Sequence, residues 1–205
     1  MAETKFLDGA YALDGPEATK ALYSDWAEHY DAEVAENGYA SPRRCAEALA
    51  AAVEDKAAPV LDLGCGTGLS GVAFRAAGFE TLDGSDFSPE MLAAAERKGV
   101  YRRLIRGDLN EPLPGEEGEY AHIAAVGVFS PGHGPASLIH EVMRLLPAGG
   151  CFVFTLNDHA MEDPSYEGAV REVVDGGWAQ VLSKDYGEHL PKIEMGSTVY
   201  LLNRC

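Results

Sequence analysis

The chain has 205 residues, of which 46% are hydrophobic, so it can build one domain with a full core and is short for two. With 16 basic residues against 33 acidic ones, its net charge of −17 repels phosphate backbones and anionic lipids and argues against nucleic-acid and membrane partners. The four cysteines are far apart, and no apolar leader or long apolar run is visible, so we expect a cytoplasmic protein with reduced thiols. Arg102, Arg103 and Arg106 are the only candidates for a basic patch.

The first 55 residues predict an N-terminal helical cap. From Ala18 to Tyr30, aromatic residues including Trp26 recur at helical spacing. A second helix is expected over residues 43–54, with Ser41 suited to its N-cap and Pro42 to its first turn. Trp26 and Tyr30 could close over a ligand and shape an acceptor pocket, although aromatic residues at this spacing also commonly form core.

From Pro59 onward, short apolar runs alternate with helical segments, which is typical of βαβ units and a mostly parallel sheet. Strands are expected at residues 60–63, 80–85, 103–106, 120–126 and 151–156, with helices near 69–77, 88–98, 136–146 and 166–174. Residues 178–183 and 198–202 suit a terminal antiparallel hairpin. The predicted fold is α/β, a doubly wound sheet of seven strands in one domain: a cap (1–55), a ligand-binding core (56–160), and a C-terminal helix and hairpin (161–205).

A glycine-rich turn, Leu61-Asp62-Leu63-Gly64-Cys65-Gly66-Thr67-Gly68, joins the first predicted strand to its helix. Glycines let the backbone approach a ligand closely, and the helix N-terminus points amide hydrogens at it, although such turns also serve as purely structural corners. Asp86 follows at the end of the second strand, roughly 20 residues later, where an acid accepts hydrogen bonds from ribose hydroxyls. Asp86 could instead cap the next helix. Together the turn and the acid predict a nucleoside-containing ligand.

A second interpretation of the glycines is a nicotinamide or flavin site. Gly66, Gly68 and Gly71 satisfy the spacing G-x-G-x-x-G of that fingerprint. The fingerprint needs its first glycine directly after the strand, whereas Gly64 already occupies that place and Asp62 lies within the strand end. An NAD- or FAD-binding protein is therefore the less favoured alternative.

In these segments the chain resembles the class I S-adenosylmethionine-dependent methyltransferases, over residues 60–156 and more loosely throughout. The turn from Leu61 to Gly68 looks like the first motif of the family, and the segment from Gly84 to Leu92 is similar to the second. Gly107-Asp108-Leu109 looks like the third, and the segment from Leu145 to Gly150 resembles the proline-glycine turn before strand five. The segment from Tyr23 to Asp31, with Gly38-Tyr39 and Pro42 after it, also looks like the cap of a subgroup near the human methyltransferase-like proteins of the Williams-Beuren region.

The resemblance implies a Rossmann-like fold, S-adenosylmethionine as the cofactor, and a set of contact residues. Asp62 and the three glycines would cradle the methionine part, Asp86 would hold the ribose, and Phe87 would lie against adenine. Asp108 would reach the adenine amino group. The full implied set is Asp62, Gly64, Cys65, Gly66, Gly68, Asp86, Phe87, Asp108 and Leu109, with Val126 and Gly127 near the transferable methyl group.

Methyl transfer from a sulfonium is an in-line displacement, so the protein must mainly align the nucleophile with the methyl carbon and sulfur. A hydroxyl or protonated amine acceptor would need a general base, for which histidine is the default. His133 follows the fourth strand at the ligand edge of the sheet and is the first choice, although a loop histidine is often simply exposed; His29 is the second. Residues 157–163 match no metal-binding signature, and we expect a solvated acidic loop.

The predicted function is therefore methyl transfer to a small molecule, with no nucleic-acid and no membrane partner. The alternative is a catalytically inactive module that binds S-adenosylmethionine and acts as a regulator. The sequence indicates neither the acceptor nor the oligomeric state, because the acceptor pocket is built from loops that differ among proteins of one fold.

Overall fold

The computed structural model describes residues 29–130 and 133–205. Most of the first predicted helix, with Trp26, lies outside these residues. The strands are β1 (Val60–Leu63), β2 (Leu82–Asp86), β3 (Arg103–Arg106), β4 (His122–Phe129), β5 (Cys151–Asn157), β6 (Ala179–Leu190) and β7 (Met195–Arg204). The helices are α3 (Tyr30–Glu36), α4 (Ser41–Ala52), α5 (Leu69–Ala76), α6 (Pro89–Lys98), α7 (Leu138–Leu145), α8 (Asp158–Glu162) and α9 (Pro164–Asp175), with a 3-10 helix η1 (Pro191–Ile193).

The seven strands form one sheet in the order β3-β2-β1-β4-β5-β7-β6. The first five strands pair in parallel, and β7 pairs antiparallel with both β5 and β6, which confirms the predicted mostly parallel sheet and terminal hairpin. Because β1 pairs with β2 on one side and β4 on the other, the direction of winding changes at β1. Open α/β sheets bind ligands at such a point, beyond the carboxyl ends of the strands.

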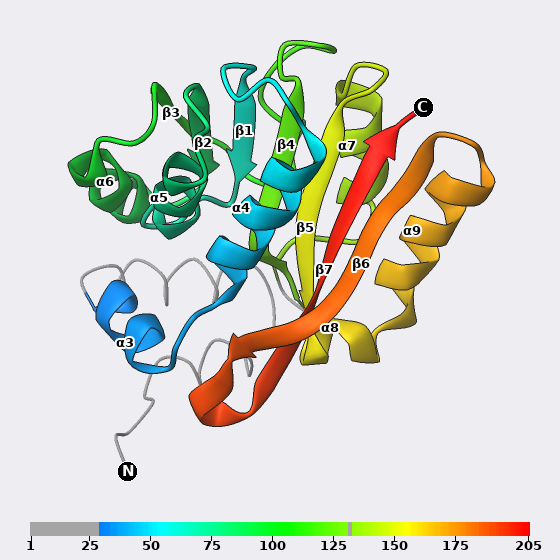
Figure 1. Ribbon diagram of the computed structural model, residues 1–205. Helices are drawn as coiled ribbons and strands as arrows, with labels where there is room; N and C mark the ends of the chain where they lie inside the picture. The colour runs from blue at the N-terminus through cyan, green and yellow to red at the C-terminus, as the bar shows by residue number, and fades with distance from the viewer. Residues whose placement is uncertain (1–28, 131–132) are drawn as a thin grey trace.

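Helices cover both faces of the sheet (Figure 1). On one face, α4 and α5 bury Leu49 and Phe74 in a core cluster with residues of β1, β4 and β5. On the other face, α7 and α9 bury Ile139 and Val170 in a second cluster. All four residues of β1 are buried, so this strand lacks the alternation of a half-exposed strand, as expected for a central parallel strand.

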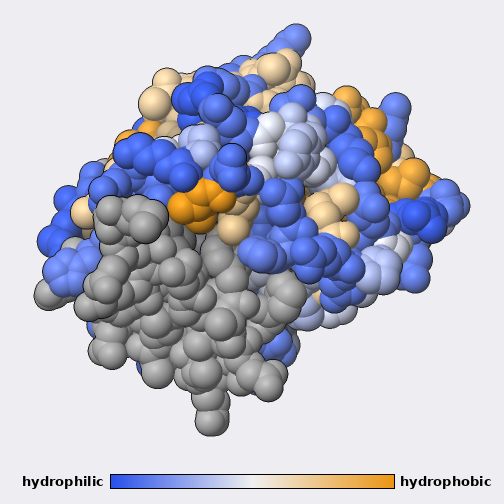
Figure 2. Space-filling model, turned by 90° about the horizontal axis from the view of Figure 1, so that it is seen from below, coloured by the Kyte–Doolittle hydropathy of each residue, from blue (hydrophilic) through white to orange (hydrophobic). Residues whose placement is uncertain are grey.

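The terminal hairpin is much longer than the sequence predicts. The β6 strand runs on to Leu190, seven residues past the expected end, and its pairing with β7 continues to Leu190 and Met195. Its second half is polar because β6 is an edge strand, whose outward side chains lie in water. The hairpin therefore carries its tip past the carboxyl edge of the sheet (Figure 1). Seen from that edge, the described surface is mainly hydrophilic (Figure 2).

Two local predictions are wrong. Ala40, not Ser41, is the N-cap of α4; Ser41 is the first helical residue, because its hydroxyl bonds to His189 and Ser197 instead of to the helix. The expected acidic loop after β5 contains the short helix α8, which Asn157 caps by accepting a hydrogen bond from the Ala160 amide. Within the described ranges, no helix is both long and apolar enough to cross a bilayer.

Candidate functional site

The glycine turn after β1 has a backbone that only glycine adopts readily. Gly64 and Gly66 have φ values of 63° and 52°. A Cβ on Gly64 would lie 2.6 Å from Val128, so this glycine allows β4 to pack closely. A Cβ on Gly66 would meet no heavy atom within 4 Å. The backbone of Gly66 therefore faces open space, as close approach of a ligand requires.

Asp86 meets this turn directly. The Gly66 amide donates to one Asp86 carboxylate oxygen at 2.9 Å, and the Ser88 amide donates to the other at 2.9 Å. Burial raises the pKa of Asp86, while these backbone hydrogen bonds oppose the rise. Each carboxylate oxygen can accept a second hydrogen bond, so the group keeps capacity for ribose hydroxyls. Both sequence interpretations of Asp86 are compatible with this geometry, because the same carboxylate also shapes the entry to α6.

Asp62 lies fully buried in the middle of β1. Its Oδ2 accepts hydrogen bonds from the Ser70 hydroxyl and the Tyr101 hydroxyl, both at 2.6 Å. No donor among the described residues reaches its Oδ1. Burial raises the pKa of Asp62 to about 6, against the lowering effect of the two hydroxyls. A buried acceptor without a donor is costly, and the ammonium group of a bound methionine moiety would supply one.

A cavity lies beside the turn, between the cap and the sheet. Its wall joins Tyr30 of α3 to the glycine turn and to Val126 of β4. The sequence predicts Tyr30 as a residue of the acceptor pocket. It does not predict that role for Tyr39, which lines the same cavity. The full lining is Tyr30, Tyr39, Pro42, Gly64, Cys65, Gly66, Thr67, Leu69, Ser70 and Val126.

Asp31 connects helix α3 of the cap to the glycine turn through hydrogen bonds. Its carboxylate accepts hydrogen bonds from the Thr67 hydroxyl and, at 2.6 Å, from the Lys98 ammonium. Lys98 also donates to the Thr67 carbonyl at 2.6 Å. Asp31 and Lys98 are 67 residues apart, so no local sequence signal could have paired them.

The end of β4 provides the opposite wall. The strand runs to Phe129, three residues past its predicted end, and its register shifts between Ala125 and Phe129. Gly127 lies within this irregularity with a φ of 70°, and its amide donates to the Thr155 hydroxyl at 2.8 Å. Val126 and Gly127 therefore lie at the carboxyl edge, on the same side as the glycine turn.

The remaining residues implied for the cofactor follow the ends of the first three strands. Leu109 reaches the glycine turn, since its side chain lies 3.9 Å from the position of a Cβ on Gly64. Asp108 accepts two hydrogen bonds from Asn110, both at 3.0 Å, and so shapes its own loop. Phe87 follows Asp86 directly at the entry to α6. The Cys65 amide donates to the Ser85 carbonyl at 3.0 Å, and burial raises the pKa of its thiol well above the ordinary value.

Neither of the two histidines proposed as bases is among the described residues that line the cavity beside the turn. His133 follows β4, and its Nδ1 lies 2.8 Å from the Ser130 hydroxyl. His29 is the exposed N-cap residue of α3. A third histidine, His189 near the end of β6, was missed from the sequence; it is buried, and its Nδ1 lies 2.7 Å from the Ser41 hydroxyl.

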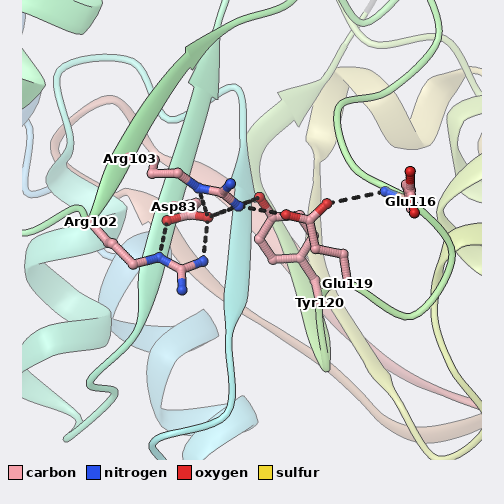
Figure 3. Close-up of polar contacts among 6 residues, drawn as sticks. All are labelled: Asp83, Arg102, Arg103, Glu116, Glu119 and Tyr120. Atoms are coloured by element: carbon pink, nitrogen blue, oxygen red, sulfur yellow. Dashed lines mark hydrogen bonds and ion pairs between the residues drawn. The ribbon is translucent and has the colours of Figure 1, made fainter.

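The candidate basic patch is largely neutralised. Both guanidinium groups of Arg102 and Arg103 converge on the buried carboxylate of Asp83, and Arg103 also contacts Glu119 (Figure 3). The distances from Asp83 are 2.7–2.9 Å. Burial alone would raise the pKa of Asp83, but hydrogen bonds from the two arginines and Tyr120 outweigh it and lower the pKa to about 2.

Comparison with known proteins finds similarity to methyltransferases. A model described as a methyltransferase domain matches residues 60–150. Human methyltransferase-like protein 27 is 40% identical over 131 residues, which are 62% of this chain and 54% of that protein. The 18S rRNA (guanine-N(7))-methyltransferase of Bos taurus is 40% identical over 67 residues, which are 33% of this chain and 24% of that protein. The chain thus spans about half the length of the human relative and less of the bovine one.

Solved structures share the fold at low identity. A chain from the complex of the Haloferax volcanii Trm112 methyltransferase activator matches with a TM-score of 0.65 and 19% identity, covering 87% of this chain and 96% of that one. Magnesium protoporphyrin IX methyltransferase from Synechocystis, which holds S-adenosylhomocysteine, matches with a TM-score of 0.61 and 15% identity, covering 80% and 83%. Residues 60–150 therefore match a methyltransferase domain, and the chain shares its fold with a methyltransferase whose structure holds S-adenosylhomocysteine.

Proposed function

We propose that the protein transfers a methyl group from S-adenosylmethionine to a small-molecule acceptor. The observation that carries this proposal is the contact between Asp86 and the Gly66 amide, at the point where the sheet changes its direction of winding. Asp86, a carboxylate that can bind ribose hydroxyls, thus lies next to the glycine turn, whose exposed backbone at Gly66 can bind the methionine part of the same ligand.

The residues take the following roles in this proposal. Asp62 and the glycine turn hold the methionine part. The Oδ1 of Asp62, which no donor among the described residues reaches, accepts a hydrogen bond from the ammonium group of that part. Asp86 holds the ribose, with Phe87, Asp108 and Leu109 around the adenine. When bound, S-adenosylmethionine supplies an electrophilic methyl group on a sulfonium. The protein aligns this group with the acceptor beside Val126 and Gly127, which is where most of the rate enhancement would arise.

Charge supports a small acceptor. The net charge is −17, and two of the three arginines that might have formed a basic patch, Arg102 and Arg103, are paired with Asp83 and Glu119. A phosphate backbone would therefore be repelled over most of the surface. One relative is nevertheless named as an rRNA methyltransferase, so RNA belongs among the acceptors to be tested.

The cofactor site is tested by Asp86→Ala. We expect the dissociation constant of S-adenosylmethionine, measured by calorimetry, to rise at least fivefold, because a charge-assisted hydrogen bond is worth about 1.5–3 kcal/mol. Asp175→Ala, which removes an exposed acid at the end of α9, is the matched control and should leave affinity unchanged. Equal affinities for wild type and Asp86→Ala would remove Asp86 from the site.

The acceptor class is tested with labelled cofactor. The protein is incubated with methyl-labelled S-adenosylmethionine and either a small-molecule extract or total RNA of its host. Label in a small molecule supports the proposal, whereas label only in RNA contradicts the small-molecule part of it. Tight cofactor binding with no transfer to either fraction would favour a catalytically inactive binding module.

A further inference from the structure

Tyr39 lies between α3 and α4 and is not among the residues proposed above to bind the cofactor. Its hydroxyl oxygen abuts Gly127, since a Cβ built on that glycine would lie only 2.6 Å from it. Tyr39 also lines the cavity that the glycine turn and Val126 share. A polar side-chain atom from the cap thus stands at the end of β4, on the cofactor side of the sheet.

The tip of the terminal hairpin holds the backbone around Tyr39. The Ala40 amide donates to the His189 carbonyl at 2.9 Å, and the Lys192 amide donates to the Asn37 carbonyl at 3.3 Å. Gly38 turns the chain with a φ of 80°, and the Pro191 ring packs 3.0 Å from where its Cβ would be. The residues on both sides of Tyr39 are therefore tied to β6 and η1.

His189 holds the ring of Tyr39. The two rings meet edge to face, with centroids 5.2 Å apart and planes at 88°. His189 is itself fixed, because its Nδ1 lies 2.7 Å from the buried Ser41 hydroxyl, which lies 3.0 Å from the Ser197 hydroxyl. Burial, assisted by the charge of Arg44, lowers the pKa of His189 to about 4, against the attraction of Asp158. The imidazole is thus neutral at pH 7 and does not repel a nearby sulfonium.

We propose that Tyr39 is an acceptor-site residue whose hydroxyl hydrogen-bonds the nucleophilic group of the acceptor beside the transferable methyl, and that His189 and Ser41 are positioning residues for it. This inference rests on the proposed function, because it takes Gly127 to lie next to the methyl group. A phenol hydroxyl both donates and accepts, so it can orient a lone pair of an oxygen or nitrogen nucleophile toward the methyl carbon. An aromatic ring with two rotatable bonds gives the rigidity that alignment needs.

The test compares two cofactor analogues and needs no knowledge of the acceptor. Sinefungin carries a primary amine where S-adenosylmethionine carries its methyl group, whereas S-adenosylhomocysteine has nothing there. The amine should hydrogen-bond the Tyr39 hydroxyl. We expect Tyr39→Phe to weaken sinefungin binding by about tenfold in calorimetry and S-adenosylhomocysteine binding by less than twofold.

The matched control is Tyr186→Phe, which removes an exposed tyrosine hydroxyl that contacts Asp158 and should change neither affinity. Equal losses for both ligands in Tyr39→Phe would mean that Tyr39 only supports the fold of the site, and unchanged affinities would remove it from the site; either result overturns the inference. If the wild-type protein binds neither analogue, the proposed function itself is refuted, and this inference with it. If the wild-type protein binds both analogues and Tyr39→Phe leaves the ratio of the two affinities unchanged, only this inference is refuted.

The positioning role of His189 is tested with His189→Asn, whose amide can still reach Ser41 but which lacks the ring that packs on Tyr39. We expect a selective loss of sinefungin affinity of two- to fivefold, with S-adenosylhomocysteine affinity retained. The variant that combines Tyr39→Phe and His189→Asn should bind sinefungin no more weakly than Tyr39→Phe alone, since both changes act through one hydroxyl. Additive losses would overturn the positioning role.

Discussion

The buried carboxylate of Asp62 destabilises the free protein but favours binding of a cationic ligand group. It is fully buried, one of its oxygens has no donor among the described residues, and its pKa is raised to about 6. Because the folded pKa exceeds the unfolded value of about 3.9, the cost of burying the Asp62 carboxylate is absent below about pH 4, grows as pH rises to about 6, and is fully present above that. We infer that the free protein bears this cost at neutral pH so that a cationic ligand group can relieve it.

Asp62→Asn should therefore stabilise the free protein and weaken cofactor binding. We expect the free energy of unfolding in urea to exceed that of wild type by about 1–3 kcal/mol at pH 8, with little difference at about pH 3. The affinity for S-adenosylmethionine should fall at least fivefold, because the amide carries no charge for the ammonium group. A variant that is less stable than wild type at pH 8, or that binds equally well, would contradict this account.

The attachment of β3 to the sheet depends on side chains as well as on the main chain. Among the described strands this four-residue edge strand pairs only with β2, so few main-chain hydrogen bonds hold it. Asp83 of β2 compensates by binding Arg102 and Arg103 at the start of β3 (Figure 3). Residues that follow this strand, Asp108 and Leu109, belong to the proposed cofactor site. The attachment of β3 therefore also fixes one side of that site.

Asp83→Asn should destabilise the protein in a pH-dependent way. The folded pKa of about 2 lies below the unfolded value of about 3.9, so the stabilisation is present above pH 4 and is lost as pH falls toward 2. In urea unfolding we expect a loss of about 1–2 kcal/mol at pH 7 that shrinks by pH 3, since both arginines are half exposed. Asp185→Asn breaks an ion pair with Arg44 in which the acid is 77% exposed, and should cost under about 0.5 kcal/mol. Equal losses in the two variants would count against the role of Asp83.

At the scale of the whole molecule, the cap and the sheet meet at the proposed active site. Asp31 of α3 joins Thr67 of the glycine turn and Lys98 of α6, and so connects three separate parts of the chain. Tyr30, next to Asp31, lines the cavity beside the turn. Loosening α3 should therefore raise the entropic cost of ordering the site when the cofactor binds.

Lys98→Gln tests this connection. We expect faster amide hydrogen exchange in residues 30–36 and a two- to fivefold weaker affinity for S-adenosylmethionine, because a partly exposed ion pair contributes about 1 kcal/mol or less. Arg43→Gln is the control, since Arg43 pairs with Glu47 on the exposed side of α4 and both side chains are more than half exposed. Unchanged exchange in residues 30–36 would show that other contacts hold the cap.

Features that depend only on neighbouring residues could be predicted from the amino-acid sequence. The glycine turn after β1, the start of α6 at Ser88-Pro89 and its end before Gly99 were all predictable, because caps and glycine conformations act within a few residues. The parallel core followed from the alternation of apolar and helical segments. Asp86 could be placed beside the turn because the second strand of a βαβ unit ends next to the first.

Which distant side chains share the site could not be predicted from the sequence and follows from the way the elements pack. Asp31 meets Lys98 across 67 residues, Asp62 meets Tyr101 across 39, and Ser41 meets His189 across 148. The contact of Tyr39 with Gly127 is of the same kind. Such contacts depend on how helices and the hairpin pack on the sheet, and packing is a sum of many weak interactions that no local pattern encodes. The polar second half of β6 was missed for a related reason, since an edge strand is specified by its partner more than by its own apolar pattern.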